Sequence, residues 1–179
     1  SQSINFTGAN VSNFHLGTTA SGAITIGKFV MNNLHYFDGE LKNLRVYNDV
    51  RTESEILNDI LSYEKQSITF NNNLTTTGYE NVVDNSFIFD GVDDYFEIPV
   101  NIAPQLANSD FTIEFWANIP DSGTQRFIYD QGDSNIINGC ITIYTYLDDT
   151  LALNFTQMNA KVDISTSYNI WTHFSFVYT

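Results

Sequence analysis

Two short apolar runs on either side of an Asp-Gly pair constrain the fold more than any other stretch of this chain. Residues 87–99 read FIFDGVDDYFEIP, and the runs Phe87–Phe89 and Tyr95–Ile98 have the length of short strands. Gly91 follows Asp90 at a place where a tight turn needs a positive φ, which glycine adopts without steric cost. The stretch therefore predicts a β-hairpin.

The next apolar stretch, residues 111–118, alternates between its two faces. The sequence FTIEFWAN puts Phe111, Ile113, Phe115 and Ala117 on one face and Thr112, Glu114, Trp116 and Asn118 on the other. Further strands are expected at residues 11–16, 23–29, 41–47, 67–71, 126–130, 140–147, 151–156, 161–164 and 170–179, with a polar loop at 71–78. Short strands at such regular intervals predict an all-β, antiparallel sandwich.

One helix is expected in this β-rich chain, over residues 52–63. Thr52 is a good N-cap, and Glu55 three residues later completes a capping box. Ile56, Leu57, Ile60 and Leu61 follow at helical spacing and form one apolar stripe. We expect this helix to lie against an edge of the sandwich or to close one of its ends.

The order of these motifs resembles the laminin-G-like, concanavalin A-like jelly-roll family. FDGVDDYFEIP, DFTIEFWANI and WTHFSFVY are similar to the first two thirds of such a domain. ITIG at residues 24–27, YFDGELKNLRVYN at 36–48 and the helix that follows are similar to its last third. The resemblance implies a jelly-roll sandwich. It implies little about activity, because one sandwich fold hosts many functions.

The two similarities occur in inverted order along the chain. Residues 1–65 resemble the C-terminal portion of one domain, and residues 66–179 resemble the N-terminal portion of a second. Each piece alone leaves strand edges and half a core exposed. The chain is then a window on a tandem array, closes on itself like a circular permutant, or completes a neighbouring chain by strand complementation. We favour the first and third together, which gives repeated units that assemble head to tail.

No catalytic residues are predicted. The family's hydrolases carry the pattern Glu-x-Asp-x-x-Glu, which is absent here, and Glu114 has no acidic neighbour on its own strand face. His15, His35 and His173 are isolated, without a nucleophile motif around them. Cys140 is the single cysteine and lies in an apolar run, which predicts a buried thiol.

A structural calcium ion is the one cofactor that the sequence suggests. Asp90, Asp93 and Asp94 lie within five residues, carboxylates are the ligands that calcium prefers, and related domains often hold this ion. The alternative is that these acids only form the turn, and we favour it.

Aromatic side chains give the only indication of ligand binding. Trp116 lies on the polar face of its strand, and Tyr144 and Tyr146 share a face opposite Ile141 and Ile143. On an open surface such rings suit the apolar faces of sugars. We favour the alternative, in which the helix or loops cover these rings.

Charge restricts the partners. Seven basic and 21 acidic residues give a net charge of −14, which repels nucleic acid and anionic lipid, and no apolar run is long enough to insert into a membrane. The sequence therefore predicts a non-catalytic structural or adhesive module of a larger extracellular, fibre or virion-surface protein, with neighbouring copies as partners. The alternative is a lectin-like module that binds carbohydrate.

Overall fold

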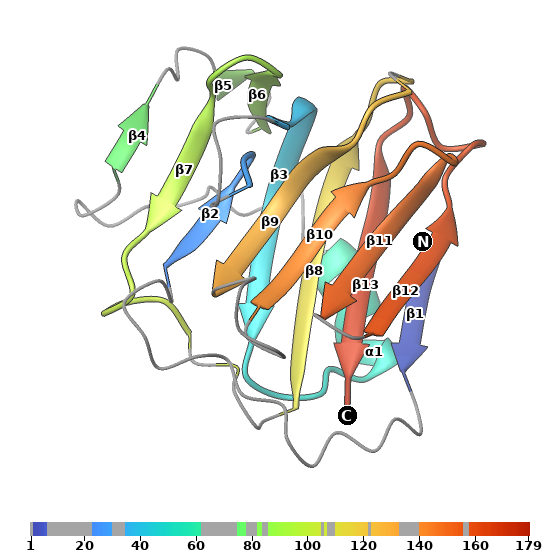
Figure 1. Ribbon diagram of the computed structural model, residues 1–179. Coiled ribbons are helices and arrows are strands. Elements are labelled where there is room, and N and C mark those ends of the chain that lie inside the picture. Colours follow the sequence, from blue (N-terminus) through green and yellow to red (C-terminus); the bar gives the residue numbers. More distant parts are fainter. Residues whose placement is uncertain are drawn as a thin grey trace.

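Alternating strands build a sandwich of two β-sheets in the computed structural model (Figure 1). The structure describes residues 2–6, 23–29, 35–61, 75–77, 82–83, 86–104, 106, 110–121, 123–132, 140–155 and 158–179. The six-stranded sheet contains, in spatial order, β1 (Gln2–Phe6), β13 (Thr172–Tyr178), β8 (Phe111–Asn118), β3 (Asp38–Tyr47), β6 (Ser86–Asp90) and β5 (Val82–Val83). The seven-stranded sheet contains β12 (Met158–Asp163), β11 (Thr150–Phe155), β10 (Cys140–Thr145), β9 (Arg126–Gly132), β2 (Ile24–Ile26), β7 (Tyr95–Ile98) and β4 (Thr75–Thr77).

Strand pairing within both sheets is antiparallel, except where β1 pairs in parallel with β13 at the edge of the six-stranded sheet. The prediction of an all-β sandwich with one short helix is confirmed. The inner faces of the sheets form one large core. Phe111, Ile113, Phe115 and Ala117 of β8 are all buried in it, as their alternation predicts.

The predicted hairpin at residues 87–99 is wrong. β6 and β7 have the expected positions in the sequence, but β6 joins the six-stranded sheet and β7 joins the seven-stranded one. The turn between them, with Gly91 at φ 77°, carries the chain from one sheet to the other. The reason is that both runs bury aromatic rings in the same core, where Phe89 meets Phe96 edge to face at 5.7 Å.

The two segments that resemble different domain portions share both sheets. β3 lies between β8 and β6, and β2 lies between β9 and β7, so two strands of residues 1–65 are flanked on both sides by strands of residues 66–179, and the edge strand β1 pairs with β13. Strands of both segments therefore pair within the same two sheets of this single chain. The assignment of the segments to two different domains stays a prediction.

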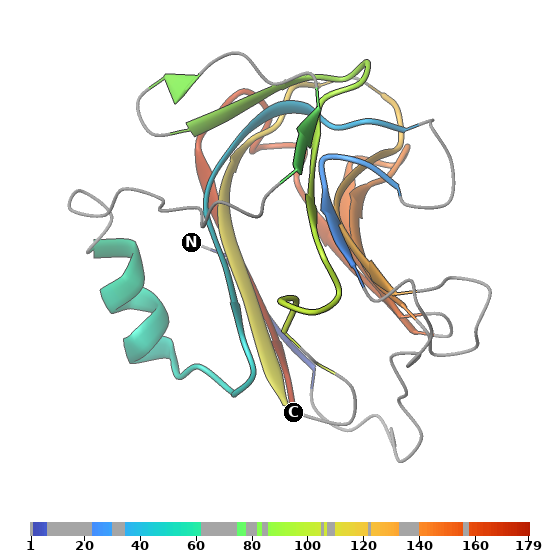
Figure 2. The same ribbon diagram turned by 90° about the vertical axis from the view of Figure 1, so that its left-hand side faces the viewer.

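The helix α1 (Glu53–Leu61) lies outside the six-stranded sheet, on the side away from the core (Figure 2). Its capping box forms as predicted. The Thr52 N–H donates to Glu55 Oε2 at 2.8 Å, and the Glu55 N–H donates to Thr52 Oγ1 at 3.3 Å. The predicted apolar stripe is wrong at Leu57, which is 44% exposed, whereas Ile56 is buried. The helix meets the sheet largely through polar side chains.

The remaining strand predictions have mixed outcomes. Strands occur near residues 24–26, 126–132, 140–145, 150–155, 158–163 and 172–178, close to where they were expected. The expected strands at 11–16 and 67–71 lie outside the described residues. The polar loop expected at 71–78 is wrong in part, because Thr75–Thr77 pair with β7 as the edge strand β4. Cys140 is buried, as predicted.

Candidate functional site

A bulge in β3 decides which side chains reach the outer face of the six-stranded sheet. Lys42 lies opposite Trp116 of β8 and Arg45 opposite Glu114, so two residues of β3 match one of β8 between these pairs. Asn43 adopts φ 52° there, a conformation that asparagine tolerates better than most residues. Because of the extra residue, Lys42 and Arg45 both point outward.

Asp59 of α1 is the centre of a polar network that attaches the helix to this face. Its carboxylate accepts a hydrogen bond of 3.0 Å from the hydroxyl of Tyr47. It also forms ion pairs of 3.1 Å with the guanidinium groups of Arg45 and Arg51. Burial alone raises the pKa of Asp59, but the hydrogen bonds from Tyr47 and Arg51 and the charge of Arg45 bring it below its ordinary value. Asp59 therefore remains ionised beneath the helix.

Glu114 lies on β8 beneath this network and is 1% exposed. Its Oε1 accepts long hydrogen bonds of 3.4 Å from Arg45 and from the Tyr47 hydroxyl. Burial, followed by the negative charge of Asp59, raises the pKa of Glu114 to about 7, although Arg45 acts in the opposite direction. The two carboxylates share Arg45 and Tyr47, so the structure supplies the acidic partner of Glu114 that its own strand lacks.

His173 and Ser175 of β13 adjoin Glu114 on the same outer face. His173 Nε2 is 3.6 Å from Glu114 Oε2, and Ser175 lies directly opposite Glu114 in the strand register. Burial and the charge of Arg45 lower the pKa of His173 to about 4. Among the described residues, Glu114 Oε2, His173 Nδ1 and Ser175 Oγ make no hydrogen bond. A serine, a histidine and an acid thus come together, and all three are at most 4% exposed.

Farther from α1 the same face becomes more open and aromatic. Thr112 and Glu114 are buried, whereas Trp116 is half-buried. Lys42 Nζ is 3.8 Å from the ring centre of Trp171 and 6.0 Å from that of Trp116. We call Lys42, Trp116 and Trp171 the tryptophan patch. Two indole rings and a cation at a half-open position are suited to contact the apolar face of a polar ligand.

Tyr144 and Tyr146 lie on the outer face of the other sheet. Tyr144 is 5% exposed and stacks on Phe127 of the neighbouring strand β9, with the ring centres 5.1 Å apart. Tyr146 is 38% exposed, and Lys161 Nζ lies 4.0 Å from the centre of its ring. The three predicted ligand-binding residues therefore do not form one site, because the sandwich separates Trp116 from both tyrosines.

Asp90, Asp93 and Asp94, which we call the acidic turn, do come together. Carboxylate oxygens of the three residues lie within 4.8 Å of one another. Asp90 Oδ1 accepts the N–H of Val92 at 2.8 Å and Asp94 Oδ2 accepts the N–H of Asp90 at 3.1 Å. These are turn-forming contacts.

Sequence reasoning missed most of the outer face of the six-stranded sheet. Alternation in THFSFVY puts His173 and Ser175 on the same face, and this signal was available. Asp59 offered none, because only tertiary packing brings a helical residue to β8. Trp171 lies just before β13. It belongs to the tryptophan patch because Lys42 of β3, on the other side of β8, reaches its ring.

Comparisons with family models, curated proteins and solved structures give no match for this chain. The resemblance to laminin-G-like domains therefore stays a prediction. In the part of the chain that the structure describes, no helix combines the length and the apolar character needed to cross a bilayer.

Proposed function

We propose that this chain is a non-catalytic structural or adhesive module of a larger, repeat-containing extracellular, fibre or virion-surface protein. The support comes from how its reactive side chains are used. Glu114 and Asp59, the pair that comes nearest to a hydrolase arrangement, are hydrogen-bonded to Arg45 and Tyr47 and attach α1 to the sheet. A carboxylate that is 1% exposed serves the fold rather than a substrate.

Neighbouring copies of the chain are the proposed partners, and one observation carries this part. β2 and β3 occupy central positions in the two sheets, although both come from the N-terminal segment. Without that segment, both sheets of residues 66–179 have a gap in the middle. The same segment from a neighbouring chain would fit the same gap with the same hydrogen bonds, and repeated exchange would give a head-to-tail assembly.

A cysteine-mixing experiment tests this exchange. Glu40 of β3 faces Asn118 of β8 on the outer face, with their side chains 3.1 Å apart. Glu40→Cys and Asn118→Cys are made in separate chains, each with Cys140→Ala, and are unfolded and refolded together under oxidising conditions. A disulfide between the two chains forms only when segments are exchanged.

The matched control uses Thr142→Cys and Asn154→Cys, which face each other within the C-terminal segment. No exchange of the N-terminal segment brings these two positions together between chains. If the Glu40 and Asn118 variants also fail to cross-link, and the chain stays a compact monomer at all concentrations, assembly by exchange is refuted.

Carbohydrate binding is the second candidate, and the tryptophan patch favours it. Nucleic acid does not suit the surface, because each described lysine lies over an aromatic ring and each arginine pairs with a carboxylate. A glycan array tests the candidate. Binding that is lost in Trp116→Ala and kept in Tyr146→Ala would assign it to the patch, whereas an array without signal refutes this candidate.

A further inference from the structure

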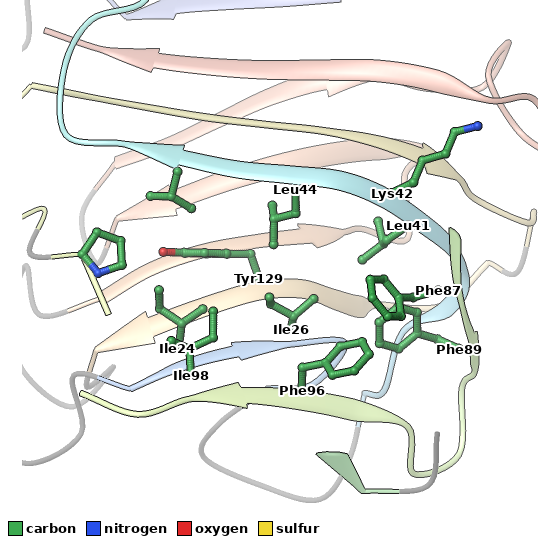
Figure 3. A pocket seen from close by; sticks show the side chains of 12 residues that line it. Ile24, Ile26, Leu41, Lys42, Leu44, Phe87, Phe89, Phe96, Ile98 and Tyr129 are labelled. Carbon is green, nitrogen blue, oxygen red and sulfur yellow. The ribbon is translucent and has the colours of Figure 1, made fainter. Parts of the chain in front are cut away.

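A cavity of about 230 Å³ lies between the two sheets (Figure 3). The six-stranded sheet lines one side of it with Leu41, Leu44 and Val46 of β3 and Phe87 and Phe89 of β6. The seven-stranded sheet lines the other side with Ile24 and Ile26 of β2 and Phe96 and Ile98 of β7. The N-terminal and C-terminal segments therefore both contribute to its wall, and neither segment forms it alone.

The wall offers an occupant almost no polar contact. The ammonium group of Lys42 points away from the other lining side chains and lies against Trp171, so it offers an occupant no charge. The hydroxyl of Tyr129 already donates to Gln131 Oε1 at 2.6 Å. A charged or strongly polar occupant would lose its hydration without replacement, so the lining selects a neutral, apolar one.

The volume is large for a protein interior. Voids in native cores rarely exceed the size of a water molecule, and apolar cavities of about 150 Å³ stay dry and accept benzene. This cavity is about one and a half times as large. It also has partly exposed walls, since Leu44, Val46, Phe87 and Ile98 are half-buried rather than fully buried. An occupant can therefore enter from the side of these residues.

We propose that the cavity is a binding site for one small, neutral, apolar molecule of about the size of a substituted benzene ring. The inference is independent of adhesion and of carbohydrate binding, because the cavity faces the core whereas the tryptophan patch and Tyr146 face outward. A ligand held there touches both segments of the chain, so it stabilises the closed arrangement of the sandwich.

The test uses p-xylene as the probe and the full chain as the protein. At a p-xylene concentration of about ten times its Kd, the folding equilibrium constant should rise about elevenfold, which a thermal melt detects. 4-Methylbenzylammonium differs by one charged group and should not bind. In methyl-labelled protein, the NMR shifts caused by p-xylene should be confined to the methyl groups of residues such as Ile24, Leu41 and Leu44.

Leu44→Phe fills part of the cavity with a larger side chain, so it should reduce the affinity for p-xylene at least tenfold. Leu44→Met conserves volume at the same position and should keep it, as should Leu147→Phe at an exposed turn. Because the methyl shifts are measured on the unaltered chain, the test remains decisive if Leu44→Phe does not fold. Absence of saturable binding, equal binding of the ammonium analogue, or contacts in ligand-free spectra between lining methyl groups and another part of the chain would each overturn the proposal.

Discussion

The carboxylates around Glu114 and those of the acidic turn differ in what compensates their charge. Beneath α1, Glu114 and Asp59 are shielded from water and depend on Arg45, Arg51 and the Tyr47 hydroxyl. In the acidic turn, Asp90 and Asp93 are exposed to solvent, and Asp90 accepts the backbone N–H of Val92. Replacing an acidic residue should therefore lower the unfolding free energy strongly beneath α1 and little at the exposed positions of the acidic turn.

The largest effect is expected from Arg45→Met, which removes the arginine beside Glu114 and one of the two arginines beside Asp59. Breaking a buried ion pair costs about 3–5 kcal/mol, because one charge remains buried without compensation. Arg45 is 17% exposed on its side chain, so we expect a loss near the lower end, about 3 kcal/mol of unfolding free energy. Urea unfolding followed by circular dichroism measures it.

Lys161→Met is the matched control for Arg45→Met. Lys161 pairs with Asp148 at 2.9 Å, but both side chains are exposed. Its removal should leave the urea midpoint nearly unchanged, because exposed ion pairs are compensated by water. Equal midpoints for the two variants would mean that the network beneath α1 does not stabilise the fold.

The second effect is a pH dependence that Glu114→Gln should remove. The pKa of Glu114 rises to about 7 in the folded chain from an ordinary value of 4.5, so the folded state binds its proton more tightly. The stability that this group contributes is complete at low pH and is lost as the pH rises toward 7. From pH 5 to pH 8, the unfolding free energy of the glutamine variant should therefore rise by about 2 kcal/mol relative to that of the unaltered chain.

Glu55→Gln is the control for Glu114→Gln. Hydrogen bonds from Thr52 lower the pKa of Glu55, so this carboxylate is ionised in both states throughout most of the same pH range. The stability difference between this variant and the unaltered chain should be nearly constant from pH 5 to pH 8. A constant difference for Glu114→Gln as well would mean that Glu114 is ionised in the folded chain.

His173→Gln should reveal the opposite slope. The pKa of His173 falls to about 4 from 6.5, so its stabilising contribution is complete above about pH 6.5 and is lost as the pH falls toward 4. Between pH 7 and pH 5, the unfolding free energy of the unaltered chain should fall by about 1–2 kcal/mol relative to that of the variant. Denaturant titrations at these two pH values measure this. An unchanged difference would indicate that folding leaves the pKa of His173 at its ordinary value, and a gain by the unaltered chain would indicate a protonated His173 paired with Glu114.

Alternation along single strands was sufficient to predict the sandwich and the buried face of β8. Each face of residues 111–118 has one environment, so apolar residues at every second position identify the face that packs in the core. The hairpin failed because an Asp-Gly turn reports a local change of direction and says nothing about which sheet the next strand joins. That choice was made by Phe89 and Phe96, which meet across the core.

Long-range pairing also explains why the predicted ligand-binding residues separate. Trp116 and Tyr144 both face outward from their strands, as predicted, but β8 and β10 belong to different sheets. The bulge at Asn43 was hard to place, since asparagine tolerates a positive φ but does not require one. Without the bulge, Arg45 would face the core, so Glu114 would lose this cation and Asp59 would keep Arg51 but lose Arg45.

The smallest effect is expected at the acidic turn. Asp90→Asn keeps the carbonyl oxygen that accepts the Val92 N–H, so the turn survives and the change in stability should be within about 0.5 kcal/mol. The guanidinium of Arg126 packs against Gly91 and supplies positive charge beside the carboxylates. We therefore expect millimolar calcium chloride to leave Tm where magnesium chloride leaves it. A rise specific to calcium, which Asp94→Asn abolishes, would instead assign a metal to Asp90, Asp93 and Asp94, because a ligand that binds only the folded state must stabilise it.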